Sequence, residues 1–301
     1  MCTMVSLIEV IIHPFFHSHN GGYINFSLRK LFSKGIWKDI GAMFIALYSG
    51  MFGVILAISA VQFVYRYFTL TSHHYLKYFQ SWYLIISISY TIIVGASTAS
   101  VFPLFGSSDE YVLEYFRETM KIEYDTDINH VAMFAIVPFE HNSSLPRTFR
   151  WKNVGFSGIL IFILTLQYLI VIISGWLIRS NLNKMMEYQS SLNIKLQRQF
   201  FKTLVIQITV PTLTFNIPAF FLLFTTFLDL TWDMPTGVAV YSFSIYPPVD
   251  SIVIMCVVSD YRKALKQIFM KKVFRNFGTS MADTEKSERV LNTVARNVNV
   301  Q

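Results

Sequence analysis

Five long apolar runs with almost no charge limit what this chain can fold into. The runs are 40–64, 81–105, 154–178, 203–228 and 234–258. The first four contain no Asp, Glu, Lys or Arg, and the fifth contains only Asp250. A helix needs about 20 apolar residues to cross the hydrocarbon core of a bilayer. The sequence therefore predicts an all-α fold, a bundle of membrane-spanning helices with five full spans.

The N-terminal run 4–16 is shorter, and Glu9 and Pro14 interrupt it. A helix rises about 1.5 Å per residue, so this run reaches only about 20 Å, whereas the hydrocarbon core is about 30 Å thick. We therefore expect one partial N-terminal span beside the five full ones. Such a bundle makes the chain a multi-pass membrane protein that contacts membrane lipid along its apolar faces.

Lys and Arg are divided unevenly between alternate connections, and this predicts the orientation. Segments 66–80, 179–202 and 259–301 carry most of the 25 Lys and Arg residues. Such residues collect on the cytoplasmic side of membrane proteins and near anionic lipid. Their place between apolar runs, rather than on one soluble face, argues against a nucleic-acid partner. The bundle, with a short juxtamembrane helix, is predicted over 1–274, and a disordered cytoplasmic tail over 275–301.

Two N-glycosylation sequons fall in connections that this orientation places outside the cell. They begin at Asn25 and Asn142, within the segments 17–39 and 106–153. A sequon can be modified only where it is exposed on the outer side. Both asparagines are therefore candidate glycosylation sites, and together with the charge bias they favour a cytoplasmic C-terminus.

The last two spans contain prolines and polar residues that could support a conformational change. Pro211 and Pro218 allow helix 203–228 to bend, although a static kink would fit equally well. In the last span Pro247 and Pro248 precede Asp250, an ionisable group at membrane depth. Such a carboxyl group can pair differently in two conformations. The alternative is a protonated Asp250 held by one fixed hydrogen bond.

Arg66, between Tyr65 and Tyr67, lies at the predicted inner end of span 40–64. From physical chemistry alone, an arginine there is most simply an anchor whose head reaches the membrane interface.

Aromatic residues gather near the predicted outer ends of the spans. An apolar cavity between such rings would suit a small, weakly polar ligand. Lipid-facing aromatic belts explain the same pattern, so both interpretations stay open. The candidate pocket residues are Phe44, Tyr48, Phe220, Phe224 and Tyr241. The acidic segment 106–153 is long enough to form a lid over this end.

Signals for enzyme chemistry are absent from the sequence. There is no HExxH, P-loop, GxSxG or paired CxxC pattern, and no cofactor is expected. His13, His17 and His19 lie close together, but no cysteine or acidic partner follows at a fixed spacing. Interfacial histidines are the better interpretation, and we expect no metal site.

Several motifs together resemble the Str class of nematode serpentine chemoreceptors (serpentine receptor class r), over residues 4–274. The motifs are Pro14 with His19-Asn20-Gly21, Phe63-Val64-Tyr65-Arg66-Tyr67, Gln207 with Pro211 and Pro218, Tyr246-Pro247-x-x-Asp250, and Asp260-Tyr261-Arg262. The resemblance implies a G-protein-coupled receptor for odorant-like small molecules, in the ciliary plasma membrane of chemosensory neurons.

In such a receptor, Tyr65, Arg66 and Tyr67 stand near the heterotrimeric G protein. Tyr246, Pro247 and Asp250 stand at the last-helix switch. The family has seven helices, and run 4–16 resembles the outer half of the second helix, so the first helix is expected to be missing. No cysteine occupies either position of the usual outer disulfide.

Three other functions remain open from the sequence. A transporter or channel would line a polar path with Glu9, Gln207, Asn216 and Asp250. A truncated, non-functional receptor remnant is the second. A membrane enzyme is the third, and the lack of clustered His, Ser or Asp within the spans argues against it.

Overall fold

The computed structural model describes residues 2–71, 79, 82, 84–106, 109–140, 148–185, 191–228, 236–257 and 267. The chain divides into two compact units, 1–251 and 252–301. In the second unit the described residues, 252–257 and Gln267, are helical. The predicted juxtamembrane helix and the tail 275–301 otherwise lie outside the described residues. The account below concerns the first unit.

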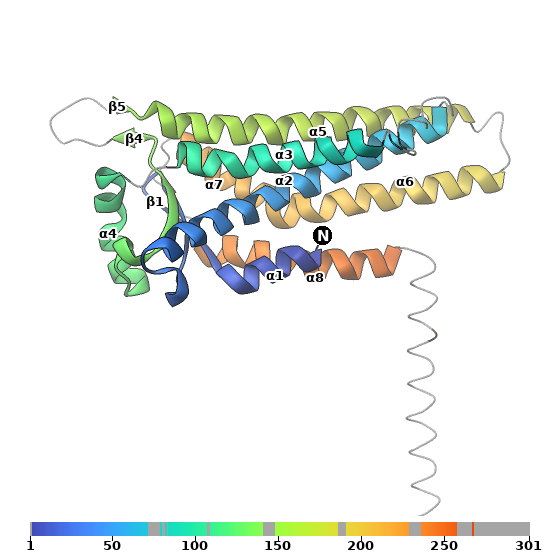
Figure 1. The fold of residues 1–301 in the computed structure, drawn as a ribbon. Coiled ribbons are helices and arrows are strands. Elements are labelled where there is room, and N and C mark those ends of the chain that lie inside the picture. Colours follow the sequence, from blue (N-terminus) through green and yellow to red (C-terminus); the bar gives the residue numbers. More distant parts are fainter. Residues whose placement is uncertain are drawn as a thin grey trace, which may run out of the picture. The chain divides into compact units, whose positions relative to one another are not determined.

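Long helices form most of the first unit (Figure 1). They are α2 (Ile36–Thr71), α3 (Leu84–Phe105), α5 (Trp151–Met185), α6 (Ser191–Pro211), α7 (Ile217–Phe227) and α8 (Thr236–Val257). A π-helical segment, η5 (Thr212–Asn216), joins α6 to α7 without a break. Over nearly all of their described residues, the predicted apolar runs coincide with these helical stretches, because an apolar backbone in lipid must satisfy its own hydrogen bonds.

Four helical stretches in the described part of the chain are long and apolar enough to cross a membrane. They are Ile36–Thr71, Leu84–Phe105, Trp151–Lys184 and Asn193–Thr226. The fifth predicted span, 234–258, coincides with α8, which has 22 residues and contains Asp250. That α8 crosses the membrane stays a prediction.

The predicted partial span 4–16 extends beyond the helix that the structure shows there, which ends at Ile12. Helix α1 covers Cys2–Ile12, and His13 then adopts a left-handed backbone conformation with φ 51°. The His13 amide still donates to the Glu9 carbonyl at 2.7 Å, which closes the last turn. Pro14 cannot continue the helix, because its ring clashes with the preceding turn and it has no N–H group.

The chain is mostly helical, but the all-α expectation missed a β-sheet. Strands β1 (Pro14–His19), β2 (Gly22–Ser27) and β3 (Ala132–Ile136) form an antiparallel sheet in the order β1-β2-β3. Asn20 and Gly21, both with positive φ, make the two-residue turn between the first two strands, as an Asn-Gly pair favours. A short ribbon pairs β4 (Phe139–Glu140) with β5 (Thr148–Phe149).

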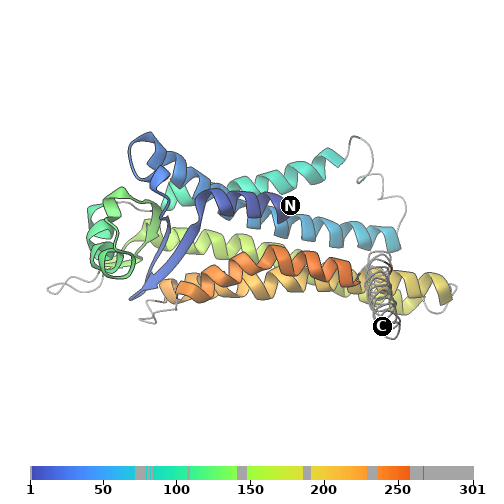
Figure 2. The ribbon, with the colours of Figure 1, turned by 90° about the horizontal axis from the view of Figure 1, so that it is seen from below.

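Helix α4 (Glu110–Tyr124) covers one face of the three-stranded sheet, and both lie at one end of the long helices (Figures 1 and 2). Ile24, Phe26 and Met133 on the sheet pack with Phe116 and Met120 of α4 in a closed apolar core. We call this assembly of the sheet and α4 the cap. Residues alternate between the two faces of a strand, so the cap presents another set of side chains to the helix bundle.

Helices α2 and α3 approach closely through glycines. A Cβ atom added at Gly50 would lie 2.8 Å from the Gly95 carbonyl oxygen, and one at Gly53 would lie 2.5 Å from the Thr98 hydroxyl. Small residues at such an interface allow the van der Waals packing that drives helix association in lipid. This contact fixes the wall of the cavity described next.

Candidate functional site

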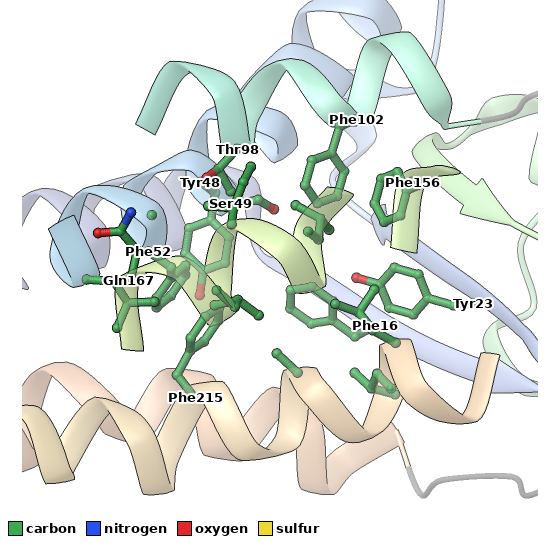
Figure 3. A pocket seen from close by; sticks show the side chains of 18 residues that line it. Phe16, Tyr23, Tyr48, Ser49, Phe52, Thr98, Phe102, Phe156, Gln167 and Phe215 are labelled. Atoms are coloured by element: carbon green, nitrogen blue, oxygen red, sulfur yellow. The ribbon is translucent and has the colours of Figure 1, made fainter. Parts of the chain in front are cut away.

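A cavity of about 80 Å³ lies between the helices and the cap (Figure 3). On the same measure, one water molecule needs roughly 15 Å³, so the cavity has room for several waters or a small organic molecule. Apolar and aromatic side chains form most of its lining. The lining residues are Phe16, Tyr23, Tyr48, Ser49, Phe52, Gly53, Leu56, Thr98, Phe102, Phe156, Leu160, Ile163, Leu164, Gln167, Phe215, Ala219, Leu222 and Leu223.

The cap closes one end of this cavity with two side chains. Phe16 on β1 and Tyr23 on β2 lie on the sheet face opposite α4, with their rings 6.3 Å apart and nearly parallel. Burial raises the pKa of the Tyr23 phenol above its ordinary value, so this hydroxyl stays protonated and uncharged. The sequence reasoning missed both residues. The signal that could have found them is the alternation of residues on either side of the Asn20-Gly21 turn.

Aromatic rings also form the wall between α3 and α5. The Phe102 and Phe156 rings meet edge to face, with centroids 5.0 Å apart at 86°. Phe102 is held from the cap side by Phe134 of β3, at 5.7 Å. Edge-to-face pairs of this kind are favourable beyond the area that they bury. The wall is therefore an ordered surface shared by bundle and cap.

Phe215 reaches the cavity from the π-helical segment. Its ring stacks on Phe52 of α2, with centroids 3.5 Å apart and the planes only 4° from parallel. Pro211 precedes the segment, and the Asn216 amide donates to the Pro211 carbonyl at 3.0 Å. The Thr212 hydroxyl pairs with that of Tyr168 on α5, at 2.7 Å. A π-helical turn held in this way is common at functional sites.

The lining contains few polar groups, and one of them has no partner. Tyr48 is 1% exposed, and its hydroxyl has no hydrogen-bond partner among the described residues. Gln167 is oriented by Tyr90, whose hydroxyl donates to the Gln167 side-chain carbonyl at 2.8 Å. No Asp, Glu, Lys, Arg or His is among the residues that line this cavity in the described part of the chain.

Of the five predicted pocket residues, only Tyr48 lines the cavity. Phe44 lies against Phe32, with ring centroids 6.4 Å apart. Phe220 and Phe224 stack on each other and are 42% and 38% exposed, while Tyr241 is 76% exposed. None of these four residues lines this cavity, and their part in ligand binding stays a prediction. The π-helical segment turns α7 so that other side chains face the cavity, and exposed rings suit contact with lipid.

The Tyr-Arg-Tyr motif lies at the end of α2 far from the cap. The Arg66 guanidinium sits over the Phe200 ring of α6, 4.4 Å from its centroid, which is a cation–π contact. Tyr65 contacts Phe79 edge to face at 5.3 Å. Tyr67 packs among apolar residues between α2, α5 and α6. Arg66 therefore contacts a neighbouring helix, whereas the anchor interpretation had it only reach the membrane interface.

The motif of the last span lies partly inside the bundle. Tyr246 and Asp250 are 3% and 8% exposed, and the Tyr246 ring lies 6.3 Å from that of Phe52. Pro247 is buried, Pro248 is exposed, and α8 remains helical through both. Phe52 thus contacts the π-helical segment on one side and the last-span motif on the other.

The glycosylation prediction is corrected at one of its two positions. Asn25 lies in the central strand β2 with its side chain 0% exposed, so the folded chain leaves no room for a glycan there. A sequon has the same sequence pattern in a buried strand as in an exposed loop. The sequence analysis placed Asn25 in a loop because it did not predict the sheet. Asn142 lies outside the described residues.

The polar residues considered for a transport path do not line the cavity. Glu9 accepts a hydrogen bond from the Ser244 hydroxyl, between α1 and α8. The other three are Gln207 on α6, Asn216 on η5 and Asp250 on α8, and none of them is among the residues that line the cavity. In the described residues no group of three or more His, Cys, Asp or Glu side chains could hold a metal ion.

Long apolar helices around a largely apolar cavity are the architecture expected of a polytopic membrane receptor. Residues 1–266 match the family of serpentine type 7TM GPCR chemoreceptors, Str. The chain is 37% identical over 269 residues to G-protein coupled receptor str-33 of Caenorhabditis elegans, covering 88% of this chain and 77% of that protein. It is 23% identical over 265 residues to Serpentine receptor class r-10 of Caenorhabditis briggsae, covering 88% and 76%.

The chain therefore belongs to the Str family of nematode seven-helix chemoreceptors, a family of non-enzymatic, G-protein-coupled membrane receptors. This agrees with the resemblance inferred from the sequence motifs. The transporter, channel and enzyme alternatives are thereby set aside.

Proposed function

We propose that this receptor binds a small environmental molecule in the cavity between bundle and cap and signals to a heterotrimeric G protein. One observation carries the proposal: Phe215, on the π-helical segment, forms part of the cavity surface and stacks on Phe52. A molecule that enters the cavity must therefore act on the segment joining α6 to α7. Binding is thereby linked to a helix that crosses the membrane.

Pro211 and Pro218 flank this segment and supply its bending point. Neither proline can complete the regular helical hydrogen-bond pattern, so bending there breaks fewer bonds than elsewhere. The Tyr168–Thr212 and Asn216–Pro211 hydrogen bonds hold the present arrangement. A ligand that favours another position of Phe215 shifts the balance between two positions of α6.

At the cytoplasmic end, the Arg66–Phe200 contact joins α2 to α6. We propose that a shift of α6 separates these two side chains and frees the Arg66 guanidinium for the G protein. Tyr65 and Tyr67 flank Arg66 in this role. The change at Phe52 would also reach the last predicted span through Tyr246, Pro247 and Asp250, and these residues would act as its switch. We further propose that the receptor acts in the ciliary plasma membrane of chemosensory neurons.

The test is a G-protein reporter assay on the full chain in cells, with a panel of odorants and surface labelling. Arg66→Ala should abolish the odorant response while surface delivery stays normal, because the cation that faces the G protein is lost. Arg117→Ala, an arginine on the cap helix α4, is the matched control and should respond as the wild type does. An unchanged response in Arg66→Ala would contradict the assigned role.

A further inference from the structure

The cavity lining carries no formal charge, and this restricts what can occupy it. None of its described residues is Asp, Glu, Lys, Arg or His, and the Tyr23 phenol stays neutral. Burying an ion there without a counter-charge costs far more than burying a neutral molecule. Glu9 acts electrostatically on Tyr48 from α1, but it lies outside the lining and already accepts from Ser244.

The hydroxyl of Tyr48 is a polar atom of the lining that an occupant could satisfy. It is buried without a partner, and in Figure 3 the phenol ring points into the space between α2 and η5. A buried hydroxyl left without a hydrogen bond costs about 1–3 kcal/mol, so a partner atom in the cavity is favoured. The other polar end nearby, the Gln167 carbonyl, already accepts from Tyr90.

Aromatic faces and edges surround this hydroxyl. Tyr48 meets Phe52 edge to face, with centroids 5.1 Å apart at 84°, and Phe102 and Phe156 form a second such pair. Aromatic surfaces of this kind pack well against a flat, apolar molecule and form few favourable contacts with a flexible, polar one.

We infer that the cavity takes a small, uncharged molecule with a flat apolar body and one hydrogen-bonding oxygen, which pairs with the Tyr48 hydroxyl. This inference rests on the proposed function, because it assigns the ligand class of the same cavity. It adds that Tyr48 sets the orientation and selects oxygen-bearing molecules over hydrocarbons of equal size. Charged analogues are excluded by the uncharged lining.

The test uses four probes of nearly equal size with the full chain in lipid nanodiscs, followed by fluorine NMR. The probes are p-fluorophenol, p-fluorotoluene, p-fluorobenzoate and p-fluorobenzylammonium, and empty nanodiscs correct for partition into lipid. The phenol should bind about 2- to 12-fold more tightly than the toluene, as one net hydrogen bond predicts. Neither charged probe should show saturable binding.

Tyr48→Phe removes only the hydroxyl and should reduce the phenol-to-toluene affinity ratio to about one, while toluene binding persists. Tyr111→Phe, on the cap helix outside the cavity lining, is the matched control and should keep the wild-type ratio. Three outcomes would overturn the inference: an unchanged ratio in Tyr48→Phe, a charged probe that binds as tightly as the phenol, or no saturable binding of any probe. Because the experiment measures binding alone, a failure of G-protein signalling is distinguished from a failure of the ligand class.

Discussion

At the scale of single residues, Arg66 and Phe200 form the contact with the clearest consequence for signalling. The pair joins the end of α2 to the middle of α6, and Phe200 is 44% exposed. A partly exposed cation–π contact is worth about 0.5–2 kcal/mol. That is enough to bias an equilibrium between two helix positions, and too little to lock it.

Phe200→Ala should therefore raise the ligand-free signal in the reporter assay by about 2- to 30-fold, the factor that such a contact energy corresponds to. Leu196→Ala is the matched control, since Leu196 is an apolar residue of α6 that is also 44% exposed. The comparison must be made at equal surface expression. Equal ligand-free signals from the two variants would show that the contact does not restrain the receptor.

At the scale of elements, the α2–α3 contact depends on glycines because the backbones are too close for side chains. At Gly50 the atoms in the way are the Gly95 backbone oxygen and the Ala99 Cβ atom, neither of which can rotate aside as the end of a long side chain can. Forcing a methyl group into such a contact shifts the helices or strains both of them. Gly158 on α5 offers the opposite case, since a Cβ atom there would meet nothing within 4 Å.

Gly50→Ala should lower the unfolding temperature of the detergent-solubilised receptor, with a loss of about 1–3 kcal/mol in stability. Gly158→Ala should leave the temperature unchanged or raise it slightly, because Ala favours the helix over Gly by about 1 kcal/mol or less. Thermal unfolding followed by intrinsic tryptophan fluorescence measures both. If the two variants melt alike, the close approach does not contribute to stability.

At the scale of the whole unit, polar contacts connect the cap to the start of α5. The Asn153 amide donates to the buried Val137 carbonyl at 2.9 Å, and Asn153 itself is 0% exposed. The Arg150 guanidinium pairs with Asp109, the N-cap residue of α4, and lies over the Tyr111 ring at 5.2 Å. The buried bond matters more, because a buried carbonyl that loses its partner gains no water in exchange.

Asn153→Ala should therefore loosen the cap, with a cost of about 1–3 kcal/mol for the unpaired carbonyl. Hydrogen exchange measured by mass spectrometry should speed up in β2 and β3, while the centres of α2 and α5 stay protected. Asn129→Ala, at an exposed asparagine between α4 and β3, is the control and should not change the exchange pattern. Faster exchange throughout the helices would instead indicate global destabilisation.

How far the sequence could predict this structure depends on the element. The long helices were predictable, because an uncharged run of some 25 residues has few alternatives in lipid. Strand β3 was not, because 132–136 is apolar without alternation and the sheet buries both faces, one under α4 and one against the bundle. The resemblance to the family used Asn20-Gly21 as a recognition motif. Its physical role, which the structure shows, is to form the turn of a hairpin.

The cavity was harder to predict than the helices. Tyr48 lines the cavity, whereas Phe220 and Phe224 do not; Phe215, which was not predicted, does. Phe220 and Phe224 were chosen because they lie near the predicted outer end of their span, whereas a π-helical turn adds a residue and rotates every residue that follows. Whether two prolines produce such a turn depends on partners such as Tyr168, which belong to another helix and cannot be read from local sequence.

The hairpin that carries Phe16 and Tyr23 has a consequence for how such receptors diversify. These two rings shape the space available to a ligand, yet the hairpin takes no part in the Phe52–Phe215 stack or in the Arg66–Phe200 contact. A substitution of Phe16 or Tyr23 should change which ligands the cavity accepts and leave the contacts proposed for signalling unchanged. Under the proposed function, the part of ligand preference that the hairpin sets can therefore change during evolution while the Phe52–Phe215 and Arg66–Phe200 contacts stay the same.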